Sequence, residues 1–307
     1  MELRNKKILL TGGHGFLGRY VYKELKKCNP INIFAPTHKE ADLINRDACE
    51  KVVKDVDIVI HLAALIGGIG FIDKNPGDLF YQNAVMGIEL MEASRKAGVK
   101  KFVTIGTVCE YPKYTKIPFN ENDLWMGYPE ETTAPYGLAK KILIVQSKAY
   151  RKQHGFNSIH LLPVNLYGPG DNFDKKLSHV IPALIKRFVE AKRNNEKSVK
   201  VWGSGLATRE FLYIEDAAKG LVLASQKYDS SDPINLGTGV ETSIKEVAET
   251  ISQIVGFNGG IVWDMTKPDG QPRRRLDVSK AKEIGFEAKT SLKKGLERTI
   301  SWYEKKY

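Results

Sequence analysis

The chain has 307 residues, of which 42% are hydrophobic and 27% are charged, so it is long enough to bury a sizeable core. Its 47 Lys and Arg against 36 Asp and Glu give a formal net charge of +11, and this composition excludes a disordered, collagen-like or disulfide-scaffold protein. The three cysteines, Cys28, Cys49 and Cys109, form no Cys-x-x-Cys pair, which indicates a reducing compartment and no metal site.

The first 165 residues alternate short apolar runs with helical patterns. They predict strands at 7–10, 31–34, 57–62, 101–106 and 158–163, and helices at 16–27, 84–97 and 135–153. The run at 57–62 lacks polar alternation, as expected of a strand that is covered on both faces. This alternation predicts a doubly wound parallel sheet of the Rossmann type.

The remainder of the chain is less regular. Helices are predicted at 180–192, 243–255 and 292–305, with turns at 203–205 and 268–270. No Pro-, Ser- or Gly-rich linker separates the two halves. We therefore expect a dinucleotide-binding domain at 1–165, with a returning segment around 207–236, and a smaller α/β substrate domain at 166–307.

No pattern for export or membrane insertion is present. The N-terminal apolar run, Ile8 to Leu10, is too short for a signal peptide, and the most apolar stretch, 58–72, is shorter than the ~20 residues of a spanning helix. We expect a cytoplasmic protein with no membrane partner. The basic residues are dispersed rather than interleaved with aromatic residues, so we expect no nucleic-acid partner either.

A glycine-rich turn follows the first predicted strand. Gly12, Gly15 and Gly18 lead into the helix at 16–27. This arrangement places backbone N–H groups and a helix N-terminus where a pyrophosphate can bind, and glycine avoids a side chain that would block the phosphates. The turn therefore predicts a dinucleotide site.

The end of the second predicted strand indicates which dinucleotide binds. NAD enzymes usually carry Asp or Glu there to hold the ribose 2′-OH. Here Thr37, His38 and Lys39 come first, and no carboxylate appears before Glu40. Because these three side chains could accommodate a 2′-phosphate, we predict NADP(H) as the cofactor.

Tyr136 and Lys140 form the second constellation. Their spacing places both on one face of the helix at 135–153. An ammonium near a phenol lowers the phenol pKa from its ordinary value near 10, so the pair could exchange a proton with a carbinol oxygen during hydride transfer. Thr107, just after the strand at 101–106, adds a hydroxyl group.

The glycine turn, Thr107 and the Tyr136-x-x-x-Lys140 pair together resemble the extended short-chain dehydrogenase/reductases. The resemblance implies that Thr107 holds the substrate oxygen, that Tyr136 is the acid/base and that Lys140 also anchors the nicotinamide ribose. It implies a homodimer with the helix at 135–153 near the interface. It also implies cofactor contacts from His14, Phe16, Leu17, Leu62, Ala63, Gly106, Pro163, Asn165, Leu166 and His179.

Longer blocks are similar to the GDP-L-fucose synthases, the GDP-4-keto-6-deoxy-D-mannose 3,5-epimerase/4-reductases. These blocks lie at 61–64, 67–69, 109–113, 163–169, 171–173, 178–184, 201–205, 209–212 and 267–270. The likeness runs from about residue 7 to Trp302 and implies a GDP-sugar substrate.

The same resemblance assigns proton transfer at the sugar ring to Cys109 and His179. A ketone at C4 acidifies the protons on C3 and C5, and inversion needs a base on one face and an acid on the other. A thiol and an imidazole both titrate close enough to neutral pH for this. Glu110, directly after Cys109, would raise the thiol pKa if the two side chains lie close.

Arg187, Trp202, Arg209 and Asp269 match positions that hold the GDP-sugar in these enzymes. The two arginines suit a diphosphate, and Asp269 suits a sugar or base hydrogen bond. Trp202 could stack on the ligand or belong to the core. The run Arg273-Arg274-Arg275 could border the diphosphate or form a solvated turn.

Two alternatives remain open at this stage. The first is a C4 reductase, with or without epimerase activity, that acts on a related GDP-4-keto-6-deoxy sugar such as a heptose. The second is a nucleotide-binding regulatory module that has the fold without the chemistry. Cys109 and His179 favour an epimerase, and the presence of Thr107, Tyr136 and Lys140 favours an enzyme.

Overall fold

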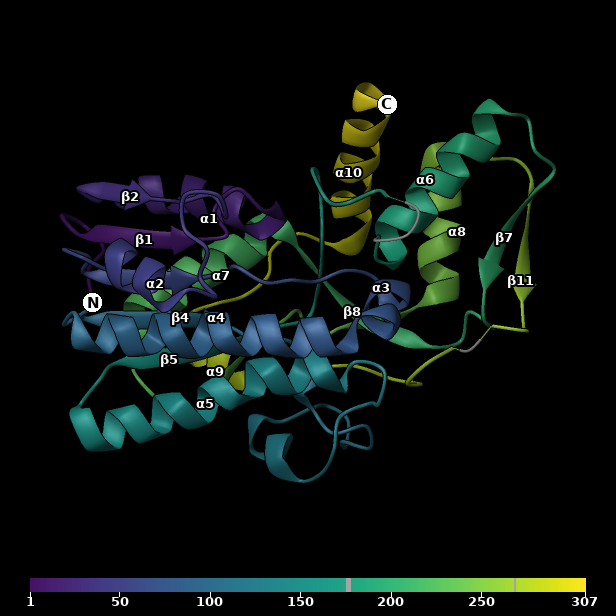
Figure 1. The fold of residues 1–307 in the computed structure, drawn as a ribbon. Helices are drawn as coiled ribbons and strands as arrows, with labels where there is room; N and C mark the ends of the chain where they lie inside the picture. The colour runs from purple at the N-terminus through teal and green to yellow at the C-terminus, as the bar shows by residue number, and fades with distance from the viewer. Residues whose placement is uncertain (175–177, 268) are drawn as a thin grey trace.

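A six-stranded parallel sheet lies at the centre of the structure, which is a computed structural model that describes residues 1–174, 178–267 and 269–307. The strands follow the order β2-β1-β3-β4-β5-β9 (Figure 1). Their bounds are β1 (Lys7–Thr11), β2 (Asn32–Phe34), β3 (Ile58–His61), β4 (Lys101–Ile105), β5 (Ser158–Pro163) and β9 (Ile234–Leu236). This sheet confirms the predicted α/β fold class.

Helices cover both faces of the sheet because its strands are apolar on both sides. Leu9, Val59 and Phe102 point into one core, with α2 (Arg46–Val52), α4 (Pro76–Lys96) and α5 (Ala134–His154). Alternate positions such as Ile8, Ile60 and Val103 point into the other core, with α1 (Phe16–Lys26) and α7 (Ile214–Lys227). Because successive side chains of a strand point to opposite faces of the sheet, each strand contributes apolar residues to both cores.

Helix α4 begins at Pro76, well before the start predicted at residue 84. Proline is favourable in a first helical turn, where its missing N–H needs no partner. The apolar pattern is interrupted by Asn83, which is buried, and its Nδ2 donates to the Leu79 and Leu65 carbonyls at 2.8 and 2.9 Å. Because this buried polar side chain interrupts the apolar pattern, hydrophobic periodicity alone does not predict the first half of the helix.

The remaining elements form a second, smaller part with its own core. A three-stranded sheet, β10-β8-β6, consists of β6 (Asn165–Tyr167), β8 (Thr208–Tyr213) and β10 (Glu241–Ser243), and a two-stranded one of β7 (Ser198–Trp202) and β11 (Gly260–Asp264). The helices here are α6 (Val180–Arg193), α8 (Ile244–Val255) and α10 (Leu292–Lys306). Short helices complete the fold: α3 (Ile69–Lys74), α9 (Ser279–Glu283) and, after β4, the 3-10 helices η1 (Val108–Glu110) and η2 (Glu121–Trp125). No helix in the described ranges is long and apolar enough to cross a membrane.

The chain returns to the main sheet after β8. Helix α7 packs on α1, and β9 pairs with β5 as the last strand, with Leu161 opposite Ile234. The chain then leaves again through β10. The smaller part is therefore built from two separate stretches of sequence.

Asn235 fastens this returning strand. Its side chain is fully buried: Oδ1 accepts from the Tyr111 hydroxyl at 2.7 Å, and Nδ2 donates to the carbonyls of Phe119 and Asp277 at 3.0 and 2.9 Å. Its backbone N–H donates to Glu121 Oε1 at 2.9 Å. One amide thus joins β9 to two loops that are remote in the sequence.

Replacing Asn235 with Leu is expected to lower the free energy of unfolding by about 2–5 kcal/mol, because the hydroxyl and carbonyl partners would stay buried without hydrogen bonds. Urea unfolding followed by circular dichroism measures the change. Asn122→Leu, at an exposed position of the 3-10 helix that follows Phe119, should alter the free energy by no more than about 0.5 kcal/mol. Equal losses in the two variants would contradict the role given to Asn235.

Candidate active site

Most sequence-predicted site residues follow the carboxyl ends of the main-sheet strands. Gly12 to Gly18 follow β1, Leu62 and Ala63 follow β3, Gly106 to Cys109 follow β4, and Pro163 ends β5. In open parallel sheets this edge is where ligands bind. Pro163, Asn165 and Leu166 are half-buried, and Asn165 Nδ2 donates to the Glu210 carbonyl at 3.2 Å, joining this edge to β8.

The glycine turn is packed too closely for side chains. Gly12 has a φ of +69°, and a Cβ there would lie 2.7 Å from the Ala63 nitrogen. A Cβ on Gly18 would lie 2.0 Å from the Gly12 oxygen. Gly15 is the N-cap of α1, where no side chain caps the first-turn N–H groups of Phe16 and Leu17. This backbone cradle at a helix N-terminus fits the pyrophosphate of a dinucleotide.

A carboxylate lies closer to the end of β2 than the sequence suggests. The backbone N–H and the hydroxyl of Thr37 both donate to Glu40 Oε2 at 2.7 Å. His14 Nε2 contacts the Ala35 carbonyl at 2.9 Å, and His38 lies 3.7 Å from Asp42 on the exposed loop. The hydrogen bonds from Thr37 hold the pKa of Glu40 below its ordinary value, so this edge carries a negative charge at neutral pH.

Tyr136 and Lys140 are both buried on α5, and η1 packs against the first turn of that helix. A Cβ on Gly137 would lie 2.3 Å from the Cys109 carbonyl oxygen. Thr107 is the N-cap of η1, and its Oγ1 accepts from the Cys109 N–H at 3.2 Å. The structure therefore places the turn that carries Thr107 and Cys109 against the first turn of α5, which carries Tyr136, and the roles that the resemblance implies for them stay predictions.

The electrostatics differ from the sequence-based expectation that Lys140 lowers the Tyr136 pKa. Burial raises the pKa of Tyr136 above its ordinary value, with further contributions from Cys109 and Glu110. Burial also lowers the pKa of Lys140 to about 8. Desolvation is the largest cause for both groups, and the phenol stays protonated at neutral pH, the state in which it can donate a proton.

Cys109 is half-buried, and its Sγ accepts from Arg274 Nη1 at 3.7 Å. The neighbouring Arg273 instead forms an ion pair with Glu241. Glu110 is fully buried and bonds to the Thr107 N–H at 2.8 Å and to His160. Sequence reasoning missed the Arg274 contact, because the two residues lie far apart in the chain and only the folded turn brings them together.

His179 is the N-cap of α6, and its exposed side chain makes no capping hydrogen bond. The protein around it lowers the pKa of the imidazole through desolvation. Among the residues that the structure describes, no hydrogen bond joins His179 to Tyr136, Lys140 or Cys109. Its predicted role stays a prediction.

A second cluster surrounds Trp202, which is 61% exposed and so does not belong to the core. The Arg187 guanidinium lies 5.6 Å from the indole centroid, and the Lys267 ammonium lies 5.7 Å from it. Arg187 Nη1 also donates to the Lys200 carbonyl at 3.2 Å. An exposed indole between two cations offers a stacking surface beside positive charge.

Arg209 lies between the two clusters. Its Nη1 donates to the Gln271 carbonyl at 2.6 Å and its Nη2 to the Asp269 carbonyl at 3.3 Å. Burial, followed by the repulsion from Arg274, lowers the pKa of Arg209 to about 10. The Asp269 carboxylate accepts from the Ser204 N–H and hydroxyl at 2.7 and 2.6 Å, so it fixes the predicted turn at 203–205. Pro268 of the other predicted turn lies outside the described residues.

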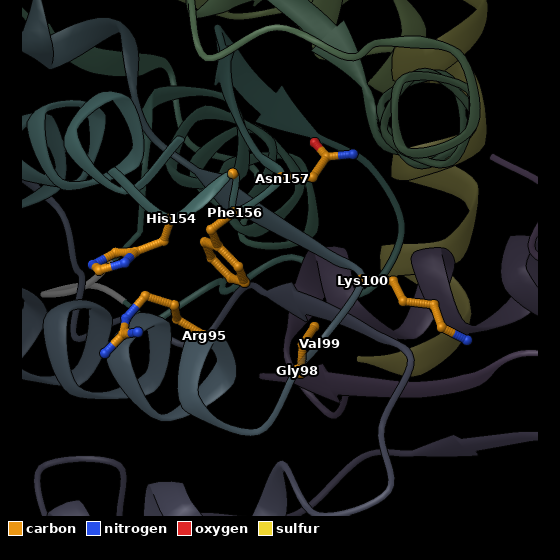
Figure 2. Close-up of a pocket in the computed structure, with 8 residues that line it drawn as sticks. Arg95, Gly98, Val99, Lys100, His154, Phe156 and Asn157 are labelled. Atoms are coloured by element: carbon orange, nitrogen blue, oxygen red, sulfur yellow. The ribbon is translucent and has the colours of Figure 1, made fainter. Parts of the chain in front are cut away.

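A cavity of about 430 Å³ lies away from these residues (Figure 2). It adjoins the C-terminal ends of α4 and α5, and its lining consists of Arg95, Gly98, Val99, Lys100, His154, Gly155, Phe156 and Asn157. No sequence-predicted site residue lines it. The described ranges also contain no group of three or more His, Cys, Asp or Glu side chains arranged to hold a metal ion.

Comparisons with known proteins agree with this geometry. The model of the NAD dependent epimerase/dehydratase family matches residues 8–237. A probable GDP-L-fucose synthase 1 of rice is 40% identical over 97% of this chain and 92% of its own. The GDP-L-fucose synthase of Escherichia coli is 36% identical over 98% of this chain and 97% of its own.

Solved structures give the same picture. A GDP-6-OMe-4-keto-L-xylo-heptose reductase from C. jejuni superposes with a TM-score of 0.93 at 30% identity, covering 99% of both chains. A GDP-L-fucose synthetase from Naegleria fowleri bound to NADP gives 0.89 at 30% identity, over 99% of this chain and 95% of the other.

Gly18→Ala is expected to weaken the binding of NADPH by at least about tenfold, because the added Cβ displaces the Gly12 carbonyl and with it the turn. Gly77→Ala in α4, where a Cβ would have no atom within 4 Å, is the matched control and should bind normally. Titration of NADPH fluorescence measures both affinities. An unchanged affinity in Gly18→Ala would show that the turn does not hold the dinucleotide.

Proposed function

Because the chain belongs to the NAD dependent epimerase/dehydratase family and is a homologue of GDP-L-fucose synthases, we propose that it converts GDP-4-keto-6-deoxy-D-mannose and NADPH into GDP-L-fucose. The observation that carries the proposal is the packing of the Thr107–Cys109 turn on Gly137 in the first turn of α5, the helix that carries Tyr136 and Lys140, which supports proton transfer and reduction in one place. Residues 1–165 and the returning segment of α7 and β9 then hold the cofactor, and the rest of 166–307 holds the sugar nucleotide.

A reduced dinucleotide held by the glycine turn would supply the hydride for reduction at C4 of the sugar. Thr107 orients the C4 oxygen by a hydrogen bond, and Tyr136 donates its phenolic proton to that oxygen. Lys140 faces the phenolate that remains and stabilises it by its charge. The buried position of Tyr136 supports this direction of transfer, because burial keeps the phenol protonated until the substrate oxygen develops negative charge.

In the epimerisation step, Cys109 and His179 exchange the protons on C3 and C5 while the C4 carbonyl remains polarised by Thr107 and Tyr136. Arg274 Nη1 donates to the Cys109 sulfur and brings a positive charge to this side chain. Arg187, Arg209 and Lys267 provide positive charge for the diphosphate, and Trp202 provides a face for stacking.

A second candidate reaction is C4 reduction of a related GDP-4-keto heptose without epimerisation. The high structural similarity to the heptose reductase favours it. The two candidates differ in whether the protons on C3 and C5 exchange with solvent. A purely regulatory module is disfavoured, because Thr107, Tyr136 and Lys140 are all present and lie together at one sheet edge.

The proposal includes a homodimer formed through α4 and α5. Phe80, Tyr81 and Ile88 of α4 and Val145 of α5 are exposed apolar side chains on these two packed helices. Pairing the same face of a second copy would remove this apolar surface from water.

Incubation of the enzyme with GDP-4-keto-6-deoxy-mannose and NADPH in heavy water tests the reaction. Product NMR should show deuterium at both C3 and C5 and the L-galacto configuration. An undeuterated reduced product would favour the heptose-type reductase, and the absence of turnover would contradict the proposed substrate.

Two variants should separate the epimerisation step from the reductive step in the same experiment. Cys109→Ser should reduce deuterium incorporation by at least about 100-fold, because it removes the proton carrier. Tyr136→Phe should instead abolish most NADPH oxidation while deuterium exchange continues. Equal losses of both steps in both variants would contradict this division of roles.

Glu40→Gln is expected to lower the KM for NADPH by about fivefold and to leave the KM for NADH unchanged or higher, because the carboxylate on Thr37 repels a 2′-phosphate. Steady-state kinetics with each cofactor measure the ratio of the KM for NADPH to the KM for NADH. Glu50→Gln removes the same charge from the exposed end of α2 and should leave the ratio unchanged. No change in Glu40→Gln would place the 2′-phosphate elsewhere.

A further inference from the structure

A buried acid–imidazole pair lies directly beside the turn at 106–109, and the proposed reaction assigns it no role. Glu110 of η1 and His160 of β5 have no exposed side-chain surface, and Nε2 of His160 donates to the two Glu110 oxygens at 3.1 and 3.2 Å. Charged groups are costly to bury unless they are fully hydrogen-bonded. A pair at this depth beside Cys109 therefore points to a function beyond packing.

The pair is the centre of a network that joins three elements. Glu110 Oε1 accepts from the Thr107 N–H at 2.8 Å, and Nδ1 of His160 contacts Thr104 Oγ1 at 2.6 Å. The Thr104 hydroxyl in turn lies 3.3 Å from the Ile159 carbonyl. The end of β4, the start of η1 and the middle of β5 are thus held by one chain of polar contacts, and Thr107 lies at its end.

The same pair fills the space below Gly106. A Cβ on Gly106 would lie 2.1 Å from Glu110 Oε1 and 2.2 Å from His160 Nε2. The turn therefore rests on the carboxylate and the imidazole themselves. The distance of the turn from the sheet depends on these two side chains. The position of Thr107 and Cys109 against α5 therefore depends on them too.

The charge of Glu110 also shifts the pKa values of the reacting groups of α5. Burial lowers the pKa of Lys140, whereas the negative charge of Glu110 raises it. The same charge raises the pKa of Tyr136 and of Lys141. From β3, His61 also faces Lys140, and burial keeps this imidazole neutral with a pKa of about 3. Of the groups around Lys140, Glu110 is thus the one whose charge favours the ammonium form.

We propose that Glu110 and His160 are positioning residues for the reductive step: the pair fixes the turn at 106–109 against α5, and Glu110 supplies the buried negative charge that faces the Lys140 ammonium. This inference rests on the proposed function for its catalytic consequence. Its electrostatic part concerns the protein alone and can be tested without substrate.

The first experiment is a titration of Lys140 by NMR in protein labelled with ¹³C-lysine, assigned by comparison with Lys140→Arg. The wild type should titrate near 8, and Glu110→Gln should titrate about one pH unit lower, because the charge that favours the ammonium is gone. Glu110→Asp retains the charge and should restore most of the shift. An unchanged Lys140 pKa in Glu110→Gln would overturn the proposal.

Glu121→Gln is the matched control. Glu121 is also a buried carboxylate that accepts a backbone N–H, that of Asn235 at 2.9 Å, but it is paired with Lys280 rather than facing Lys140. Its replacement should lower stability and leave the Lys140 titration unchanged. If Glu110→Gln does not fold, the double variant Glu110→Met/His160→Leu removes the carboxylate together with its hydrogen-bond partner and should show the same lowered Lys140 pKa.

The second experiment measures NADPH oxidation against pH. Reduction requires Tyr136 protonated and Lys140 charged, and loss of Glu110 lowers both pKa values, so the alkaline limb of kcat should move to lower pH by about one unit in Glu110→Gln. A purely structural role would lower stability with no movement of the limb. If the wild type turns over no GDP-4-keto sugar, the proposed function fails, while the Lys140 titration still decides the role of the pair.

Discussion

The close approach of the Cys109 carbonyl to Gly137 is the contact on which the candidate site depends. It lets the short helix η1 lie directly on the first turn of α5, and this places Thr107 and Cys109 beside Tyr136. A Cβ at position 137 would lie 2.3 Å from the Cys109 carbonyl oxygen, so any side chain there would force the two segments apart. The reacting side chains are therefore aligned by backbone packing, which is more rigid than a set of side-chain contacts.

Three other glycines act in the same way along this sheet edge. Gly12 and Gly18 allow the first turn to close on itself and on Ala63, and Gly106 allows the turn after β4 to rest on Glu110 and His160. These glycines follow the carboxyl ends of β1 and β4, the edge of the sheet at which the proposed function places the dinucleotide.

The sequence predicted the features that depend on local pattern. The buried strands read as continuous apolar runs, and the glycine turn and the Tyr136–Lys140 spacing placed the main residues on the correct elements. The features it missed depend on which side chains the fold brings into contact and which it buries. Glu40 turns back onto Thr37, Arg274 reaches Cys109 from a distant turn, and burial reverses the direction expected for the Tyr136 pKa. Neither residue spacing nor composition reports desolvation or long-range contacts.

The return of the chain through α7 and β9 has a consequence for how such proteins diversify. Because the smaller part is assembled from the stretch between β5 and β8 and from the stretch after β9, a single genetic crossover near residue 165 would transplant β9 and its Asn235 anchor into a foreign sheet. Exchange of the whole sugar-nucleotide region between homologues needs at least two junctions. Gradual substitution of residues such as Trp202 and Arg274 is a simpler route to a new substrate than wholesale recombination.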